Sequence, residues 1–263
     1  MSDSDRDHLK TTFNQDAEHY DRARPGYPEP LFDDLVALAR LQPGARLLEV
    51  GCGTGRATVP LARRGIAITC VELGENLAAV ARRNLSGFPE VRVVVAPFET
   101  WDAGGETFDL VYAASSWHWL DPDIRYARAA GLLKPGGSLA IISGGHAFPK
   151  DADPFFRDIQ QVYEAIGEDK VVEWPLPADV PDMREEIEVT GLFGDFHSRR
   201  YVWELVYTAK EYIDLLNTFS GHIALDPEKR DYLYRNVRDR INARSDPRVR
   251  RHWLAILNVA RRV

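Results

Sequence analysis

The sequence predicts an α/β protein with a doubly wound, mostly parallel sheet. Strand-like apolar runs alternate with helical patterns over residues 44–143, which is the order typical of this class. The first apolar run, residues 47–50, passes directly into a glycine loop, Gly51-Cys-Gly-Thr-Gly55. A chain of 263 residues is long enough for one such domain with additional helices.

The glycine loop predicts a ligand site at the carboxyl end of the first strand. Gly51, Gly53 and Gly55 lack the Cβ atoms that would keep a ligand from the backbone, and they accept backbone angles that cost other residues energy. We expect a helix from about residue 56 to 64, which would direct its free N–H groups and positive dipole end to the same place. Ligands usually bind at this edge of open α/β sheets.

Spacing and charge select among the possible ligands. The third glycine comes one residue too early for the G-x-G-x-x-G dinucleotide fingerprint. A phosphate loop needs Lys and then Ser or Thr after its last glycine, whereas Arg56 follows here. Glu49 would repel a pyrophosphate and suits a ligand with an amino group or a sulfonium.

An acidic residue followed by G-x-G-x-G resembles the first motif of class I S-adenosylmethionine-dependent methyltransferases. The resemblance continues through predicted strands at 67–72, 91–96 and 108–113, and residues 132–137 resemble the family's turn into a fifth strand at 138–143. It implies a Rossmann-like seven-stranded sheet of order 3-2-1-4-5-7-6, with the last strand antiparallel. It also implies S-adenosylmethionine as cofactor and S-adenosylhomocysteine as product.

The resemblance further assigns residues to the cofactor. Glu72 would receive the two ribose hydroxyls, and Phe98 or its backbone N–H would hold the adenine, although Pro97 stands where many members have an acidic residue. Arg24, in the segment 20–28 that matches the opening of small-molecule members, would meet the methionine carboxylate through two hydrogen bonds. Alternatively, Arg24 pairs with a protein acid and the nearby tyrosines only pack. The expected cofactor site comprises Tyr20, Arg24, Glu49, Gly51, Cys52, Gly53, Gly55, Glu72, Leu73, Pro97, Phe98, Ala114 and Ser115.

The acceptor site is expected near the loop after the fourth strand, where the family meets both sulfonium and acceptor. Trp117, His118 and Trp119 are the expected acceptor-binding residues of this loop, and His118 is also the candidate catalytic base or orienting residue. Alternatively, the His118 ring bonds a backbone group, while one of Trp117 and Trp119 packs the core and the other faces the pocket. Further candidates for acceptor binding are Tyr27, His146 and His222, and the two histidines are equally compatible with structural roles.

The expected reaction is an in-line displacement at a methyl group, which requires alignment and exclusion of water but no metal. A base is needed for a hydroxyl or protonated amine and not for a carboxylate. The acceptor atom is therefore left open as an oxygen, a nitrogen or a carboxylate of a small molecule.

Composition argues against several partners. A net charge of −7 and a pI near 5.6 disfavour nucleic acid, although residues 226–263 hold eleven Lys or Arg against five Asp or Glu. The first seven residues are polar and charged and no apolar run approaches membrane-spanning length, so we expect a cytoplasmic protein. Cys52 and Cys70 lack metal-ligand spacing. No oligomeric state follows from the sequence.

Caps and periodicity divide the chain into a helical N-terminal cap (1–43), a core (44–207), a helical lid (208–245) and a final core strand (246–263). Asp-Pro pairs at 121–122 and 153–154 predict the starts of crossover helices. A capping box at 208–211 and Asp226-Pro227 predict two lid helices between an alternating strand at 200–207 and an apolar strand at 253–260.

Three functions remain compatible with the sequence. The first is a small-molecule methyltransferase similar to the trans-aconitate group. The second is a protein or RNA methyltransferase, if the basic C-terminal helices form a continuous patch beside the pocket. The third is a regulatory protein that binds the cofactor without catalysis.

Overall fold

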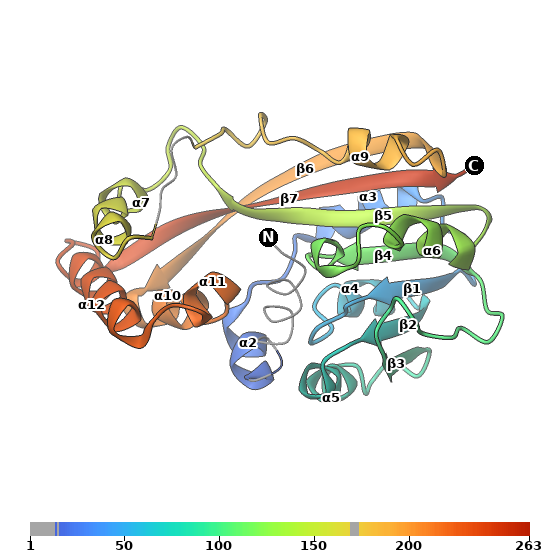
Figure 1. Cartoon of the computed structure of the whole chain (residues 1–263), viewed down its shortest axis with the longest axis horizontal. Coiled ribbons are helices and arrows are strands. Elements are labelled where there is room, and N and C mark those ends of the chain that lie inside the picture. Colours follow the sequence, from blue (N-terminus) through green and yellow to red (C-terminus); the bar gives the residue numbers. More distant parts are fainter. Residues whose placement is uncertain (1–13, 15, 169–173) are drawn as a thin grey trace.

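A computed structural model describes residues 14, 16–168 and 174–263, which form a single seven-stranded sheet with helices on both faces (Figure 1). The strand order is β3-β2-β1-β4-β5-β7-β6, as predicted. The strands are β1 (Arg46–Val50), β2 (Ala67–Glu72), β3 (Val91–Val95), β4 (Phe108–Ala114), β5 (Leu133–Ala147), β6 (Phe193–Thr208) and β7 (Arg248–Arg262).

The pairing explains where a ligand site forms. β1 pairs in parallel with β2 and β4, β2 with β3, and β4 with β5, so the carboxyl ends of these strands lie along one edge. β7 runs antiparallel to both β5 and β6, which confirms the predicted antiparallel last strand. The strand order reverses between β1 and β4, and ligands of open α/β sheets bind at such a reversal.

Helices cover both faces of the core part of the sheet. Apolar residues of α3, α4 and α5 pack on one face, and residues of α6 and α9 pack on the other. The helices are α2 (Ala17–Ala23), α3 (Glu29–Leu38), α4 (Thr58–Ala62), α5 (Glu75–Asn84), α6 (Arg125–Leu132), α7 (Phe155–Asp158), α8 (Gln160–Ala165), α9 (Arg184–Glu188), α10 (Ala209–Leu216), α11 (Ser220–Ile223) and α12 (Pro227–Asn242), with a 3₁₀ turn η1 (Trp117–Trp119).

A separate apolar cluster forms where the C-terminal end of β6 lies beside the N-terminal end of β7. Figure 1 shows the helices that gather at this end of the two strands. The cluster joins α7, α8, α10 and α12 to the ends of the two long strands through buried residues such as Phe155, Leu215 and Val237. The prediction that the helices after Asp153 cross over the sheet is therefore wrong. Those helices pack on the inserted helices because β6 and β7 extend well beyond the other strands.

Two predicted helix starts are also wrong. The helix after the glycine loop begins at Thr58 and ends at Ala62, because residues 53–57 form turns, so only a short helix faces the site. α6 begins at Arg125 instead of directly after Asp121, whose carboxylate accepts from the backbone N–H of Asp123. The predicted turn at residues 132–137 lies at the start of β5. The pairing of β5 with β4 shifts register there, and Gly136 has a φ of 71°.

The inserted helices between β6 and β7 are present as predicted, with the short α11 between the two expected ones. In the part of the chain that the structure describes, no helix combines the length and apolarity needed to cross a bilayer. The polar residues 1–7, on which the expectation of a cytoplasmic protein partly rests, lie outside the described residues.

Candidate functional site

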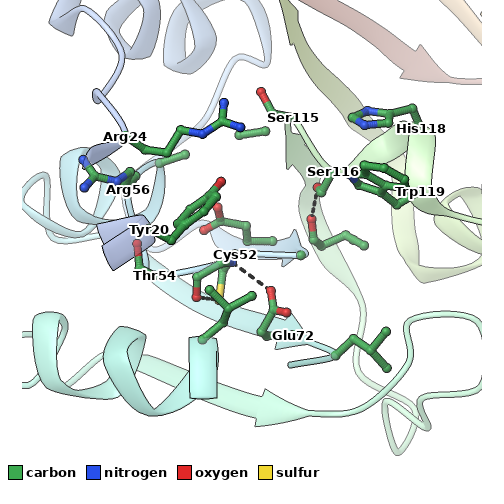
Figure 2. Close-up of a pocket in the computed structure, with 18 of the residues that line it drawn as sticks. Tyr20, Arg24, Cys52, Thr54, Arg56, Glu72, Ser115, Ser116, His118 and Trp119 are labelled. Atoms are coloured by element: carbon green, nitrogen blue, oxygen red, sulfur yellow. Dashed lines mark hydrogen bonds between the residues drawn. The ribbon is translucent and has the colours of Figure 1, made fainter. Parts of the chain in front are cut away.

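A cavity of about 370 Å³ lies at the carboxyl ends of β1, β2 and β4 (Figure 2). Its walls come from three regions that are distant in sequence: the N-terminal segment, the core strands with their loops, and the chain from β6 to β7. The expected cofactor residues that line it are Tyr20, Arg24, Glu49, Gly51, Cys52, Gly53, Glu72, Leu73, Pro97, Phe98, Ala114 and Ser115. Gly55 is the expected cofactor residue outside the lining.

The glycine loop has the backbone geometry that its sequence implied. Gly51, Gly53 and Gly55 have φ values of 68°, 56° and 90°. Residues that carry a Cβ rarely adopt this backbone conformation. A Cβ on Gly51 would lie 2.7 Å from the Cβ of Ser116, so the loop after β4 closes directly over this residue. Gly55 makes a different close approach, because a Cβ there would lie 3.2 Å from the Leu85 side chain, which explains its place behind the cavity wall.

Glu72 organises the floor of the cavity. Its Oε2 accepts a hydrogen bond from the Gly53 N–H at 2.8 Å, and its Oε1 accepts from the Gly74 N–H at 2.9 Å. Burial raises the pKa of this carboxyl, while the two N–H donors oppose the rise. Each carboxylate oxygen has a second lone pair, so this group fits a pair of ribose hydroxyls.

Glu49 lies deeper than the sequence suggested. The side chain is 1% exposed, and its Oε2 accepts hydrogen bonds of 2.6 Å from both the Thr58 and the Tyr112 hydroxyls. Burial raises the pKa of Glu49 to about 7, and the nearby Glu72 adds to the rise. Glu49 therefore ties β1 to α4 and β4 while it lines the base of the cavity, and contact with a cationic ligand group stays a prediction.

The expected adenine side is a mainly apolar surface. Leu73 is 41% exposed, whereas Phe98 is 3% exposed and belongs to the core. Arg128 donates from Nε to the Phe98 carbonyl at 2.6 Å and lies over the Phe98 ring. The backbone around Phe98 is thus held in place from outside the cavity.

The N-terminal segment crosses the cavity as the resemblance implied. Arg24 donates from Nη2 to the Thr218 carbonyl at 2.8 Å, and its Nε is buried without a hydrogen-bond partner. Burial lowers the pKa of Arg24. The Tyr27 hydroxyl lies 2.9 Å from the Ser115 Oγ, and Ser115 itself has a φ of 57°, which is unusual for a residue with a Cβ. Among the described residues, Arg24 bonds a carbonyl and no carboxylate, so its Nε is placed to receive a ligand carboxylate.

The two tryptophans of the loop after β4 lie in different surroundings, Trp117 in the core and Trp119 at the cavity. Trp117 is 2% exposed and packs edge-on against Tyr126 in the core, so the structure does not support contact between Trp117 and an acceptor. His118 and Trp119 line the cavity, with ring centroids 4.6 Å apart. Desolvation and the charge of Arg125 lower the pKa of His118, so its ring is neutral at pH 7. Figure 2 shows His118 and Trp119 together on one side of the cavity.

The other two candidate histidines lie outside the cavity lining. His146 packs between Phe148 and Phe156, and burial lowers its pKa to about 2. His222 lies 2.9 Å from the Tyr163 hydroxyl through Nε2, and burial lowers its pKa to about 4. Both histidines are part of the aromatic packing around the inserted helices.

Several residues that line the cavity were not predicted, because no local sequence signal marks them. Arg56 was used only to exclude a phosphate loop, yet it lines the cavity and lies 3.6 Å from Asp21. Trp203 and Trp253 reach the cavity from paired positions on β6 and β7, which requires the strand register. Other lining residues that were not predicted include Thr54, Glu99, Ser116, Gly144, Gly145, Phe219, Ser220 and Leu254. Within the described residues, no group of three or more His, Cys, Asp or Glu side chains is placed to hold a metal ion.

Comparison with known proteins decides the family. Residues 48–141 match the family described as a methyltransferase domain. An uncharacterized methyltransferase of Mycobacterium tuberculosis is 26% identical over 82% of this chain and 79% of its own length. A trans-aconitate 2-methyltransferase of Delftia acidovorans is 35% identical over 41% of each chain. This protein is a class I S-adenosylmethionine-dependent methyltransferase.

The fold of the methyltransferase is shared by a solved structure, that of a putative type II methyltransferase from Anaeromyxobacter dehalogenans. The two superpose with a TM-score of 0.63 at 23% identity, over 90% of this chain and 97% of the other. S-adenosylmethionine is the cofactor. The cavity fits it, because the glycine loop leaves open backbone, Glu72 presents a buried carboxylate, and Arg24 retains an unpartnered Nε.

Proposed function

We propose that this methyltransferase modifies a small organic molecule that is enclosed in the cavity together with the cofactor. The observation that carries the proposal is the composition of the cavity wall. The residues assigned to the cofactor and the aromatic residues Trp119, Trp203 and Trp253 line the same cavity. A concave cavity of about 370 Å³, lined in part by the N-terminal segment and by Phe219, suits a small acceptor better than a polymer. The kinship with a trans-aconitate methyltransferase supports the same conclusion.

In this proposal the chain's own residues bind, orient and exclude water. Glu72 and the Gly51–Gly55 backbone hold the nucleoside, and Arg24 holds the methionine carboxylate. Bound S-adenosylmethionine supplies a methyl group that its positive sulfur has already activated for displacement. Tyr27, bonded to Ser115, closes the N-terminal segment over the loop after β4.

His118 is the residue that we place beside the acceptor. Its neutral ring is able to take a proton from a hydroxyl or amine, and Trp119 fixes the ring by packing against it. A carboxylate acceptor would need no base, so the effect of removing His118 depends on the acceptor atom. The expected loss for a general base is about 100-fold or more in kcat.

The test is methyl transfer to separated fractions of a cell extract. The protein is incubated with methyl-labelled cofactor and either the dialysable or the non-dialysable fraction, with Glu72→Gln as the control that lacks the ribose contact. We expect label in the dialysable fraction with the parent protein alone. Label in protein or RNA would overturn the small-molecule proposal. Cofactor binding with no label in either fraction would favour a non-catalytic binding protein.

A further inference from the structure

One edge of the sheet is formed by β6. It pairs with β7 on one side, and no further strand pairs with it in the described part of the chain. β6 is sixteen residues long, whereas β3, at the opposite edge, has five. An edge strand presents a row of backbone N–H and C=O groups without partners in the sheet, and this row is a template for pairing with another strand. β6 is therefore the strand of this sheet with the longest edge for a second chain.

The middle of β6 exposes charged and apolar side chains on one face. Successive side chains of a strand point to opposite faces, so one face carries Arg200, Val202, Glu204 and Val206. All four residues are exposed, and Val202 and Val206 are 46% and 49% exposed. The chain before α9 comes near this face at Val180, which packs on buried apolar residues of β5 and β7. Val180 therefore covers the inner strands and leaves these four side chains of β6 exposed.

The two charged residues are only partly compensated within the chain. Arg200 donates from Nη2 to the Val180 carbonyl at 2.7 Å and forms no ion pair among the described residues. The Oε2 of Glu204 lies 3.4 Å from Nη1 of Arg250 and 3.4 Å from Nε2 of His252, and the Glu204 side chain is 51% exposed. Exposed ion pairs contribute at most about 1 kcal/mol each. Arg200 and Glu204 are therefore able to form a further ion pair with a second chain.

Symmetry determines which residues of two β6 strands face each other. Two copies related by a twofold axis perpendicular to the sheet pair antiparallel, and facing residues must point to the same face. With Val202 on the axis, Arg200 of each copy faces Glu204 of the other. With Tyr201 or Trp203 on the axis, both charged residues face uncharged ones, and with Arg200 or Glu204 itself on the axis, like charges meet. Among the registers centred on residues 200–204, the one centred on Val202 is therefore the one that pairs opposite charges.

The charges of β6 favour a second copy of the same chain. Charges on an edge strand commonly keep other strands away, but symmetric pairing of β6 brings opposite signs together. We propose that the methyltransferase forms a twofold dimer through β6, with Val202 on the axis and Arg200 of each copy paired with Glu204 of the other. Backbone hydrogen bonds along the edge and the Val202 contact hold the copies together, and the two ion pairs fix the register. This inference is independent of the acceptor that the enzyme uses.

The test measures the mass of the protein by light scattering and sedimentation over a series of concentrations. One chain has a mass of 29.7 kDa, and we expect twice this mass at high concentration, with dissociation on dilution. Arg200→Glu and Glu204→Arg each place like charges opposite one another at two positions. The dissociation constant of either variant should therefore rise at least about tenfold. The matched control is Arg199→Glu, which changes the net charge as Arg200→Glu does but faces Leu205 of the second copy, so it should dimerise as the parent does.

Mixing the variants tests the facing pair itself. In an equimolar mixture of Arg200→Glu with Glu204→Arg, each copy supplies the charge that the other lacks at both ion pairs. A dimer with one copy of each variant should therefore form. The double variant Arg200→Glu/Glu204→Arg should regain the affinity of the parent in the same way. Every variant should bind S-adenosylhomocysteine as the parent does, because Arg199, Arg200 and Glu204 lie outside the cavity lining, and this binding shows that the variant is folded.

The inference is overturned by a single-chain mass of the parent at every concentration. It is also overturned by a parent dimer whose affinity neither single variant changes, since the copies would then meet at another surface. Equal weakening by Arg199→Glu and Arg200→Glu would show an effect of net charge and not of register. Weakening that neither the mixture nor the double variant reverses would show that Arg200 and Glu204 do not face each other.

Discussion

Glu72 shows how one side chain builds part of the cofactor site. Its two oxygens join the glycine loop to the start of α5 through the N–H groups of Gly53 and Gly74. The same oxygens face the cavity, where the ribose is expected. A change at Glu72 therefore affects the shape of the loop and the contact with the ligand together.

Replacing Glu72 with Gln should weaken cofactor binding by about 10- to 100-fold, as expected when a charged acceptor is lost. The amide keeps one acceptor oxygen and turns an NH₂ group toward a backbone donor. Calorimetric titration with S-adenosylhomocysteine measures the change. Glu75→Gln, an exposed position in the first turn of α5, is the control and should bind as the parent does. Parent-like binding by Glu72→Gln would rule out the ribose contact.

Glu49 predicts a pH dependence of stability. Its pKa is raised from 4.5 to about 7 by burial, so the folded state keeps a proton that the unfolded state releases above about pH 4.5. The free energy of unfolding therefore decreases as the pH rises from about 4.5 to about 7 and then levels off. Glu49→Gln stays neutral at every pH. Relative to this variant, the free energy of unfolding of the parent should fall by roughly 3 kcal/mol between about pH 4.5 and about pH 7.

Urea unfolding of the parent and of Glu49→Gln at pH 5, 6, 7 and 8 measures this loss. Gln retains an oxygen that accepts from Thr58 and Tyr112, so the two proteins should be most similar at low pH. Parallel pH profiles would mean that Glu49 has an ordinary pKa despite its burial.

At the level of elements, the pairing of β5 with β7 places Trp253 and Leu254 of β7 beside the cofactor residues. Gly144 of β5 faces Ala255, and a Cβ at Gly144 would overlap the Leu254 carbonyl oxygen. That oxygen is backbone and cannot move aside without breaking the pairing. The next residue, Gly145, has nothing within 4 Å of a Cβ. Two adjacent glycines therefore offer a matched pair of tests.

Gly144→Ala should destabilise the protein by at least about 3 kcal/mol, because the strands must separate locally to accept the methyl group. Gly145→Ala should change the free energy of unfolding by about 1 kcal/mol or less. Urea denaturation of both variants gives the comparison. Equal stability of the two would mean that β5 and β7 are not in the register described.

The same elements show what local sequence was able to predict. The helices between β6 and β7 are confirmed, because caps and periodicity are local signals. The order of the strands and the antiparallel β7 are also confirmed, but these were implied by the resemblance to the methyltransferase family and not by local patterns. The full length of β6 was not predicted, since a register shift between Gly194 and His197 interrupts the alternation before residue 200. The packing of α7 and α8 on α12 follows from that length.

Part of the candidate site was predicted from the sequence and part was not. The residues tied to the glycine loop and the opening segment meet in one cavity, because they follow a motif whose spacing fixes their position. Trp117, His146 and His222 lie elsewhere, because their positions depend on tertiary packing and not on strand ends. Trp253 was missed for the same reason: a buried strand pattern does not show which side chains reach a cavity.

On the scale of the whole molecule, the N-terminal segment connects the core with the inserted helices. α2 contacts α5 through the exposed Glu18–Arg83 pair, and it contacts α10 through His19, whose Nε2 lies 2.7 Å from the Asp214 carbonyl oxygen. Exposed pairs of this kind contribute at most about 1 kcal/mol each. These two polar contacts are therefore weak, and a bound cofactor would add contacts at Tyr20 and Arg24.

Cofactor binding should therefore slow backbone hydrogen exchange in two regions distant in sequence, residues 16–27 and 218–220, as well as in the glycine loop. Ligand at 100 times its dissociation constant stabilises the bound state by about 2.7 kcal/mol. Backbone N–H groups that exchange only through a local opening that releases the ligand should therefore exchange roughly 100-fold more slowly. Exchange measured by mass spectrometry with and without S-adenosylhomocysteine tests this. α12 (residues 227–242) has no residue in the cavity lining and is the internal control, so its exchange should not change. Protection of the glycine loop without protection of residues 16–27 would show that the N-terminal segment does not close over the cofactor.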